Sequence, residues 1–207
     1  MPLIGTAAVL AGGQATRFGG RNKTALRLGP DAVLERQLAV LRRVADQTVI
    51  IANDPTPYRS YGAPIIPDLA PGCGALGAIY TAIQSTSASH TLVVACDMPF
   101  LGVPFLAHLI EASRDVDIAI PRTARGYEPL CAVYSRRCAA VLQRRIEAKQ
   151  LKVADLVASD HGLVIRELGS DEIDQYGREE LLFFNINTAE DYARAIDLDA
   201  ETRGHLY

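Results

Sequence analysis

A glycine-rich segment near the N-terminus, LAGGQATRFGGRNK, has residue types that are suited to binding phosphate. Gly12 and Gly13 follow the apolar run 6–10 directly, and Arg17 and Lys23 come within the next ten residues. Glycine lets the backbone approach a ligand closely and turn its N–H groups outward. Two nearby cations would neutralise negative charge on the ligand. The segment therefore predicts a polyphosphate-binding loop, with a surface turn carrying solvated charges as the plainer alternative.

Polar groups also follow the later apolar runs. Asn53 comes after the run 48–52, Asp68 after 63–66, and Asp97 after 91–95. In open α/β sheets, ligands bind outside the carboxyl ends of the strands. We therefore expect these residues, with Leu10 and Ala11, to line one ligand site.

Two familiar nucleotide motifs are weaker explanations. The P-loop pattern needs glycine immediately before the lysine and five residues earlier, where this chain has Asn22 and Arg17. The segment GCGALG at 72–77 satisfies G-x-G-x-x-G, and Asp97 lies 20 residues beyond it, as a dinucleotide fold would require. That segment does not follow its strand directly, so we interpret it as a glycine-rich wall over a base or ribose.

Short apolar runs alternate with segments of helical periodicity along the chain. The runs predict strands at 6–10, 48–52, 63–66, 91–95, 117–120, 130–134 and 181–186. The periodic segments predict helices at 33–44, 75–85, 104–113 and 138–148, and Thr188 with Asp191 forms a capping-box signature for a last helix. The stretch 151–180 suggests a short helix, a strand at 163–168 and an acidic loop. This order predicts one α/β domain with a mostly parallel sheet covered on both faces.

The composition is that of an ordinary globular protein. The 207 residues are 49% apolar and 22% charged, with a net charge of −3, which argues against a broad nucleic-acid surface. The N-terminus has neither a membrane span nor a secretory signal, so we expect a cytoplasmic protein without membrane contact. The four cysteines show no zinc spacing and are expected to be buried free thiols. The four histidines are scattered and match no catalytic motif.

The blocks LAGGQATRFGGRNK, IIPD, GALGAI, ACDMPF and NINTAEDY together resemble the molybdenum cofactor guanylyltransferases, the MobA family, over residues 5–197. The resemblance implies a single-domain, Rossmann-like, three-layer α/β nucleotidyltransferase with a mostly parallel sheet, spanning 1–207. The N-terminal half would bind the nucleotide and the C-terminal half the acceptor. The implied reaction joins GMP from GTP to the terminal phosphate of molybdopterin with Mg²⁺, and releases pyrophosphate. A monomer that contacts a molybdoenzyme or chaperone transiently is expected.

The same resemblance implies roles for individual residues. Leu10, Ala11, Gly12 and Gly13 would hold the nucleotide, as would Asn53 and Asp68, although the family asparagine aligns equally with Ile51. Lys23 and Arg17 would meet the phosphates and the leaving pyrophosphate. Asp97 would bind both nucleotide and metal, with Asn187 completing the metal shell; Asn185 would share its face in a strand, and one of the two could instead cap the last helix.

Several alternatives stay open. Asp68 could accept hydrogen bonds from guanine, but could equally serve cytosine or cap its own loop. On the acceptor side, Arg122, Arg125, Tyr127 and Arg178 are all candidates, and Glu128 stands where the family has another polar residue before proline. A cytidylyltransferase on the same cofactor, a sugar-phosphate nucleotidyltransferase and a non-catalytic nucleotide-binding protein are the competing functions.

Overall fold

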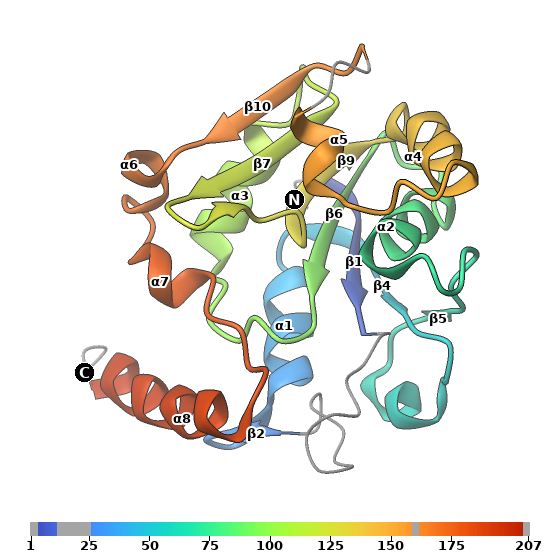
Figure 1. The fold of residues 1–207 in the computed structure, drawn as a ribbon. Coiled ribbons are helices and arrows are strands. Elements are labelled where there is room, and N and C mark those ends of the chain that lie inside the picture. Colours follow the sequence, from blue (N-terminus) through green and yellow to red (C-terminus); the bar gives the residue numbers. More distant parts are fainter. Residues whose placement is uncertain (1–3, 12–25, 159–161, 205–207) are drawn as a thin grey trace.

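A computed structural model describes residues 4–11, 26–158 and 162–204, and its centre is one mixed β-sheet (Figure 1). The strands lie in the order β10-β7-β9-β6-β1-β4-β5, and β8 pairs with β7 beside this path. Their bounds are β1 Ile4–Leu10, β4 Ala45–Ile51, β5 Ile65–Ile66, β6 His90–Ala95, β7 Ile118–Thr123, β8 Gly126–Tyr127, β9 Cys131–Ser135 and β10 Ile165–Leu168.

Strand direction in this sheet is mostly uniform. β1 is parallel to both β4 and β6, β4 to β5, and β10 to β7, whereas β9 is antiparallel to β6 and β7. The carboxyl ends of β6, β1, β4 and β5 consequently meet at one edge of the sheet. The predicted mostly parallel sheet is confirmed.

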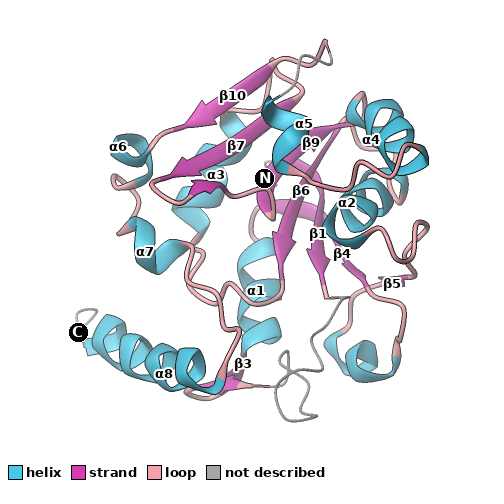
Figure 2. Cartoon of the chain, in the orientation of Figure 1, coloured by secondary structure: helices cyan, strands magenta, loops and turns pink. Residues whose placement is uncertain are grey.

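Helices cover both faces of the sheet and make three layers (Figure 2). α2, α4 and α5 pack on one face, and α1 and α3, with the short α6, pack on the other. The helix bounds are α1 Val33–Leu41, α2 Gly74–Gln84, α3 Val103–Glu111, α4 Cys138–Glu147, α5 Ala154–Ala158, α6 Ser170–Ile173, α7 Glu179–Leu182 and α8 Ala189–Gly204. A 3₁₀ helix, Thr56–Tyr61, lies between β4 and β5. None of the helices in the described ranges is long and apolar enough to cross a bilayer.

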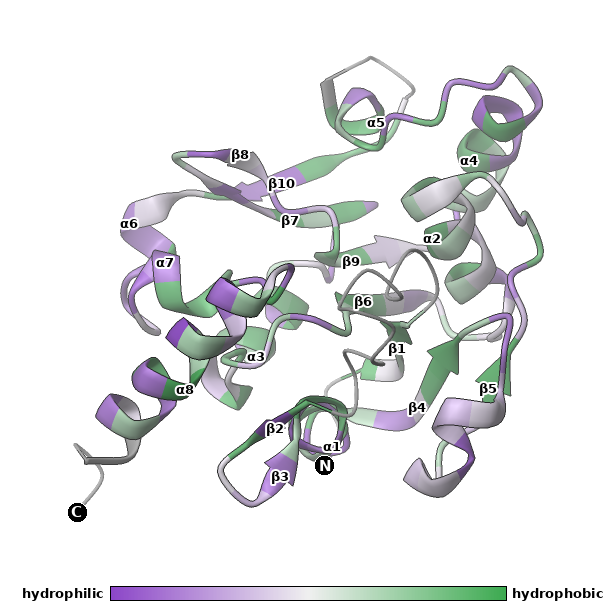
Figure 3. Cartoon of the chain, turned by 60° about the horizontal axis from the view of Figure 1, so that its bottom comes forward, coloured by the Kyte–Doolittle hydropathy of each residue, from purple (hydrophilic) through white to green (hydrophobic). Residues whose placement is uncertain are grey.

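Burial on both faces explains the apolar composition of the central strands. In β1, Ala7 and Val9 face the layer with α1, whereas Ala8 and Leu10 face the layer with α2. Since successive strand residues point to opposite faces, a strand covered on both sides needs a continuous apolar run. Figure 3 shows the same pattern as hydrophobic strands at the centre of the molecule.

The last helix, α8, packs on the small hairpin β2 Arg27–Leu28 and β3 Asp31–Ala32 rather than on the large sheet. A separate apolar cluster holds them together, made of Leu26, Leu28, Val33, Phe184, Ile186 and Ala195. The backbone N–H of Thr188 donates to Asp191 Oδ2 (2.9 Å), and that of Asp191 donates to Thr188 Oγ1 (3.1 Å). The predicted capping box is confirmed.

Two elements differ from the sequence prediction. Residues 181–186 form the end of α7 and an irregular segment instead of a strand, because their side chains are divided between two clusters. Phe183 packs in the main core, edge-on to Phe105 (ring centroids 5.5 Å), whereas Phe184 packs under α8. The predicted acidic loop contains α6, whose buried Ile173 joins the main core.

All four cysteines are free, as expected. Only Cys131 and Cys138 are buried, whereas Cys73 and Cys96 are partly exposed because they lie in turns beyond the strands.

Candidate functional site

The residues predicted to bind a ligand stand in a row at the carboxyl edge of the sheet. Asp97, Ala11, Asn53 and Asp68 follow β6, β1, β4 and β5, which are neighbours in that order. Because adjacent strands lie about 4.8 Å apart, the row is roughly 14 Å long. An elongated ligand such as a nucleotide could lie across it.

The end of β1 is tied to both neighbouring strands. Ala11 N donates to Ile51 O (3.0 Å), Leu10 O accepts from Cys96 N (3.1 Å), and the Tyr58 hydroxyl donates to Ala11 O (2.8 Å). Both side chains are buried, Leu10 at 6% and Ala11 at 2% exposure. These residues therefore fix the point from which the glycine loop departs. Gly12, Gly13, Arg17 and Lys23 themselves lie outside the described residues.

Asn53 and Asp68 contact each other across the ends of β4 and β5. The side-chain oxygen of Asn53 accepts the backbone N–H of Asp68 at 2.9 Å. Asp68 Oδ1 in turn accepts the backbone N–H of Ala70 (2.9 Å) and the hydroxyl of Thr81 (2.7 Å). One carboxylate oxygen of Asp68 is thus used inside the loop, as the capping alternative predicted. Its second oxygen, Oδ2, has no hydrogen-bond partner among the described residues.

Thr81 and Gly77 on α2 hold this loop; the sequence analysis did not name Thr81, and it interpreted Gly77 only as part of a glycine-rich wall over a ligand. The Thr81 hydroxyl accepts from Leu69 N (2.9 Å) besides donating to Asp68, and its residue is fully buried. A Cβ on Gly77 would lie 2.6 Å from Ala70 O, so only glycine permits this approach. The segment 72–77 therefore uses its glycines for packing and for the positive φ values of Gly72 (84°) and Gly74 (59°). Thr81 and Gly77 lie one turn apart within an otherwise apolar helix. A small residue and a hydroxyl at this spacing could have indicated that a loop packs on this face of the helix.

Asp97 and the segment before α8 are joined through the backbone. Ile186 N donates to Asp97 O at 3.0 Å, which brings Asn185 and Asn187 beside the end of β6. The two asparagines do not share a strand face, since the segment is irregular. Asn185 Nδ2 donates to Phe183 O (3.1 Å), while Asn187 N donates to Asp191 Oδ2 (3.0 Å) at the start of α8.

The donor atoms beside Asp97 fit a magnesium ion shared with a nucleotide. Mg²⁺ prefers oxygen ligands and commonly takes one or two carboxylates plus substrate phosphates. Asp97 offers a carboxylate. Asn187, the residue after Ile186, whose backbone N–H donates to Asp97 O, offers an amide oxygen. Across the described ranges, no group of three or more His, Cys, Asp or Glu side chains could hold a metal ion.

Three of the four acceptor candidates, Arg122, Arg125 and Tyr127, lie on a hairpin at the carboxyl end of β7, whereas Arg178 lies directly before α7. Tyr127 donates to Glu167 (2.6 Å), and Arg122 pairs with the same carboxylate (2.9 Å) while its guanidinium lies over the Tyr127 ring. Arg125 instead donates to Phe183 O (3.1 Å). Phe183 lies three residues before Ile186, whose backbone N–H donates to Asp97 O. Arg125 is therefore the candidate that the contacts connect most directly to Asp97.

Glu128, on the same hairpin, is a half-buried carboxylate. Burial raises the pKa of its carboxyl, which Arg125 at 3.7 Å counteracts in part. A carboxylate at this place would repel an acceptor phosphate and attract a hydrogen-bond donor.

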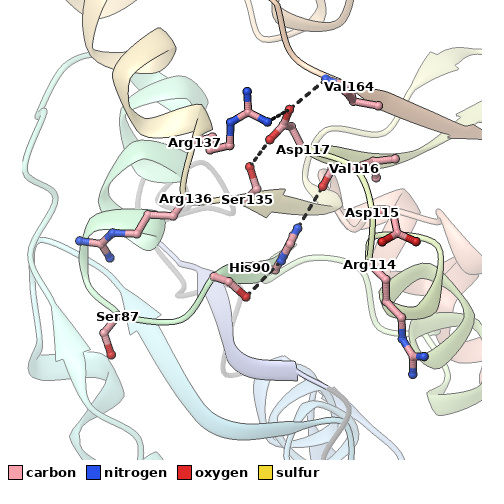
Figure 4. A pocket seen from close by; sticks show the side chains of 11 residues that line it. Ser87, His90, Arg114, Asp115, Val116, Asp117, Ser135, Arg136, Arg137 and Val164 are labelled. Carbon is pink, nitrogen blue, oxygen red and sulfur yellow. Dashed lines mark hydrogen bonds and ion pairs between the residues drawn. The ribbon is translucent and has the colours of Figure 1, made fainter.

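A hollow of about 590 Å³ lies at the opposite edge, by the amino ends of β6 and β7 (Figure 4). Its buried Asp117 accepts from Ser135 Oγ (2.8 Å) and Val164 N (3.0 Å) and pairs with Arg137 (3.3 Å). The side chains of Arg114 and Arg136 point in different directions in Figure 4 and do not converge on one point. The hollow is about 20 Å from Asp97 along β6, so it is separate from the predicted ligand site.

A three-layer α/β sheet with polar groups gathered at the carboxyl ends of neighbouring strands is the architecture of the doubly wound class, in which ligands bind at that edge of the sheet. Comparison with known proteins narrows this class. Residues 7–162 match the family model of the MobA-like NTP transferase domain, and the chain belongs to that family. It is a nucleotidyltransferase by that membership.

Individual relatives agree over nearly the whole chain. The chain is 32% identical to the molybdenum cofactor guanylyltransferase of Desulfosudis oleivorans, covering 92% of this chain and 93% of that protein. It is 31% identical to a probable molybdenum cofactor guanylyltransferase of Clostridium perfringens, covering 90% and 93%. The crystal structure of molybdopterin-guanine dinucleotide biosynthesis protein A from Archaeoglobus fulgidus superposes with a TM-score of 0.79 at 29% identity, covering 95% and 99%. The family predicted from the sequence motifs is confirmed.

Proposed function

We propose that this protein transfers GMP from GTP to the terminal phosphate of molybdopterin in a reaction that depends on Mg²⁺. The observation that carries the proposal is the likeness to guanylyltransferases over at least nine-tenths of both chains. The row of Asp97, Ala11, Asn53 and Asp68 supports it, because a nucleotide laid along the row would have its base near Asp68 and its phosphates near Asp97. The products are molybdopterin guanine dinucleotide and pyrophosphate.

The chemistry needs positioning more than a reactive side chain. An oxygen of the acceptor phosphate attacks the α-phosphorus of GTP, the bond from that phosphorus to the bridging oxygen of the β-phosphate breaks, and pyrophosphate leaves with the electron pair. The attacking oxygen is already ionised, so no strong general base is required. This agrees with a site built from carboxylates, amides and cations.

Each residue has a role in this proposal. Asp68 accepts a hydrogen bond from the N1–H or amino group of guanine through Oδ2, and Asn53 holds the Asp68 backbone. Arg17 and Lys23 neutralise the phosphates and the leaving pyrophosphate. Asp97 and Asn187 hold Mg²⁺, which supplies positive charge where charge accumulates on the phosphate oxygens. Arg125 is the residue that contacts the acceptor phosphate in this proposal. The monomeric state and a transient handover to a molybdoenzyme or chaperone stay predictions.

The experiment measures pyrophosphate release with molybdopterin, Mg²⁺ and each NTP in turn. We expect release with GTP, and a loss of roughly 100-fold or more in kcat for Lys23→Ala and Asp97→Asn, because the first removes a positive charge that neutralises the phosphates and the second removes a charged ligand of Mg²⁺. Arg114→Ala and Asp115→Asn are matched controls, since both residues are exposed and line the hollow at the opposite edge.

The outcome separates the competing functions. Release with CTP in place of GTP would assign the protein as a cytidylyltransferase. In parallel reactions with a sugar phosphate in place of molybdopterin, release only with the sugar phosphate would assign it as a sugar-phosphate nucleotidyltransferase. Binding of GTP with no turnover would indicate a non-catalytic nucleotide-binding protein.

A further inference from the structure

Gln37 is a buried polar side chain on the apolar face of α1. It is 4% exposed, and its neighbours on that face, Leu34, Leu38 and Leu41, are core residues. Its Nε2 donates to Ala95 O (2.6 Å) and to Met98 O (3.0 Å). These two carbonyls stand on either side of Asp97 in the chain. One amide group therefore spans the turn that carries the proposed metal-binding carboxylate.

Only one end of the Gln37 amide has hydrogen-bond partners among the described residues. Its Oε1 is buried and has no hydrogen-bond partner among the described residues. Burying an amide oxygen without a partner costs free energy, and an apolar residue at this position would avoid that cost. The two donated bonds are what the glutamine provides and an apolar side chain could not.

The turn has further anchors that fix its backbone. Cys96 N donates to Leu10 O (3.1 Å), and Asp97 O accepts from Ile186 N (3.0 Å). The β1 strand and the segment before α8 hold the middle of the turn, and Gln37 holds its two ends. We propose that Gln37 is a positioning residue, whose amide sets the direction of the Asp97 carboxylate by fixing the carbonyls of Ala95 and Met98. The inference rests on the proposed role of Asp97.

Gln37→Met tests the proposal, because methionine keeps the length of the side chain and removes both donors. Three measurements follow the variant: Mn²⁺ affinity in the presence of GTP by electron paramagnetic resonance of the free ion, steady-state kinetics, and hydrogen exchange of the amides at 96–98. We expect kcat to fall about 10- to 100-fold, since small displacements of a reacting group have effects of this size. Mn²⁺ affinity should fall several-fold and exchange at 96–98 should accelerate, with the KM for GTP within about twofold.

Thr6→Val is the matched control. It also removes a buried side-chain hydrogen bond, Thr6 to Thr86 (2.7 Å), but at the opposite end of β1. This variant should leave Mn²⁺ affinity, kcat and exchange at 96–98 unchanged. Equal effects of Thr6→Val and Gln37→Met on Mn²⁺ affinity would overturn the positioning role, as would unchanged Mn²⁺ affinity and exchange in Gln37→Met.

Gln37→Glu gives a second test if the methionine variant does not fold. A protonated carboxyl donates one hydrogen bond, whereas the ionised form faces two carbonyl oxygens and repels them. Gln37→Glu therefore keeps at most one of the two hydrogen bonds, so Mn²⁺ affinity should fall and exchange at 96–98 should accelerate, and no change in either would overturn the proposal. If the wild-type protein does not turn over GTP with molybdopterin, the proposed function fails, but Mn²⁺ affinity and exchange still decide the role of Gln37.

Discussion

Gly77→Ala tests whether the close packing of the loop 68–73 on α2 holds Asp68 in place. The added Cβ would lie 2.6 Å from Ala70 O and 2.9 Å from Cys73 Cβ. Neither atom can move independently, because Ala70 O accepts Cys73 N (3.1 Å) and Ala70 N donates to Asp68 Oδ1 (2.9 Å). The clash must therefore displace the loop that carries Asp68.

Two opposing terms set the effect on stability. Alanine is better than glycine in a helix interior by about 1 kcal/mol. Overpacking a dense contact costs about 1–3 kcal/mol. Taking the middle of that range, the free energy of unfolding falls by about 1 kcal/mol, which lowers the melting temperature by roughly 2–4 °C in a protein of this size.

The effect on nucleotide binding should be larger than the effect on stability. A hydrogen bond to a charged group is worth about 1.5–3 kcal/mol, so losing the contact to Asp68 would weaken GTP binding by roughly 10- to 150-fold. Thermal melting and a GTP titration measure the two effects on the same preparation.

Gly169→Ala is the control for Gly77→Ala. Its φ of −79° is open to any residue, and a Cβ there would meet nothing within 4 Å. This control should be about as stable as the wild type, because the smaller unfolded-state entropy of alanine opposes the preference for glycine at the N-cap of α6. If Gly77→Ala has the same melting temperature as Gly169→Ala and binds GTP with the affinity of the wild type, the loop does not depend on this contact and the reasoning is wrong.

Two further predictions concern stability. Burial raises the pKa of Glu128, so its stabilising form is the protonated one, present at low pH and lost as pH rises through the raised pKa. Glu128→Gln should therefore melt above the wild type at pH 7, with a difference that narrows toward pH 4, and a difference that is the same at both pH values would contradict this reasoning. Phe183→Ala should lower the free energy of unfolding by about 3–5 kcal/mol in urea titrations, because it empties a fully buried site against Phe105; a loss below 1 kcal/mol would contradict that packing.

The fold could be predicted wherever buried residues recur along the chain with the spacing of a regular helix or strand. The runs 6–10 and 91–95 are strands because helices cover both faces of the sheet, which a continuous apolar run reports directly. The run 181–186 looks the same in the sequence, but its side chains enter two different clusters, one against Phe105 and one under α8. Periodicity alone cannot separate these cases, since the difference lies in which distant elements surround the segment.

The site could be predicted to the level of strand ends. Asn53, Asp68 and Asp97 could be placed at one edge of the sheet in advance, because polar residues directly after neighbouring parallel strands lie at the same edge. Thr81 and Gln37 were not, since each lies inside a helix and acts on a residue far away in the chain. Both are polar positions on an otherwise apolar helix face, and that is the pattern by which such residues could be sought.

The two carboxylates of the proposed site are held in different ways, and the difference suits their roles. Asp68 is held by its own side chain, because Oδ1 accepts from Ala70 and Thr81, and Oδ2 is left without a hydrogen-bond partner among the described residues. One fixed acceptor matches a directional hydrogen bond from a base. The Asp97 turn is held by its backbone, through Gln37 at Ala95 and Met98 and through Ile186 at Asp97 O. Anchoring the main chain on both sides of Asp97 fixes the position and direction in which the side chain leaves the backbone, and a carboxylate that would hold a metal ion at a defined place needs both.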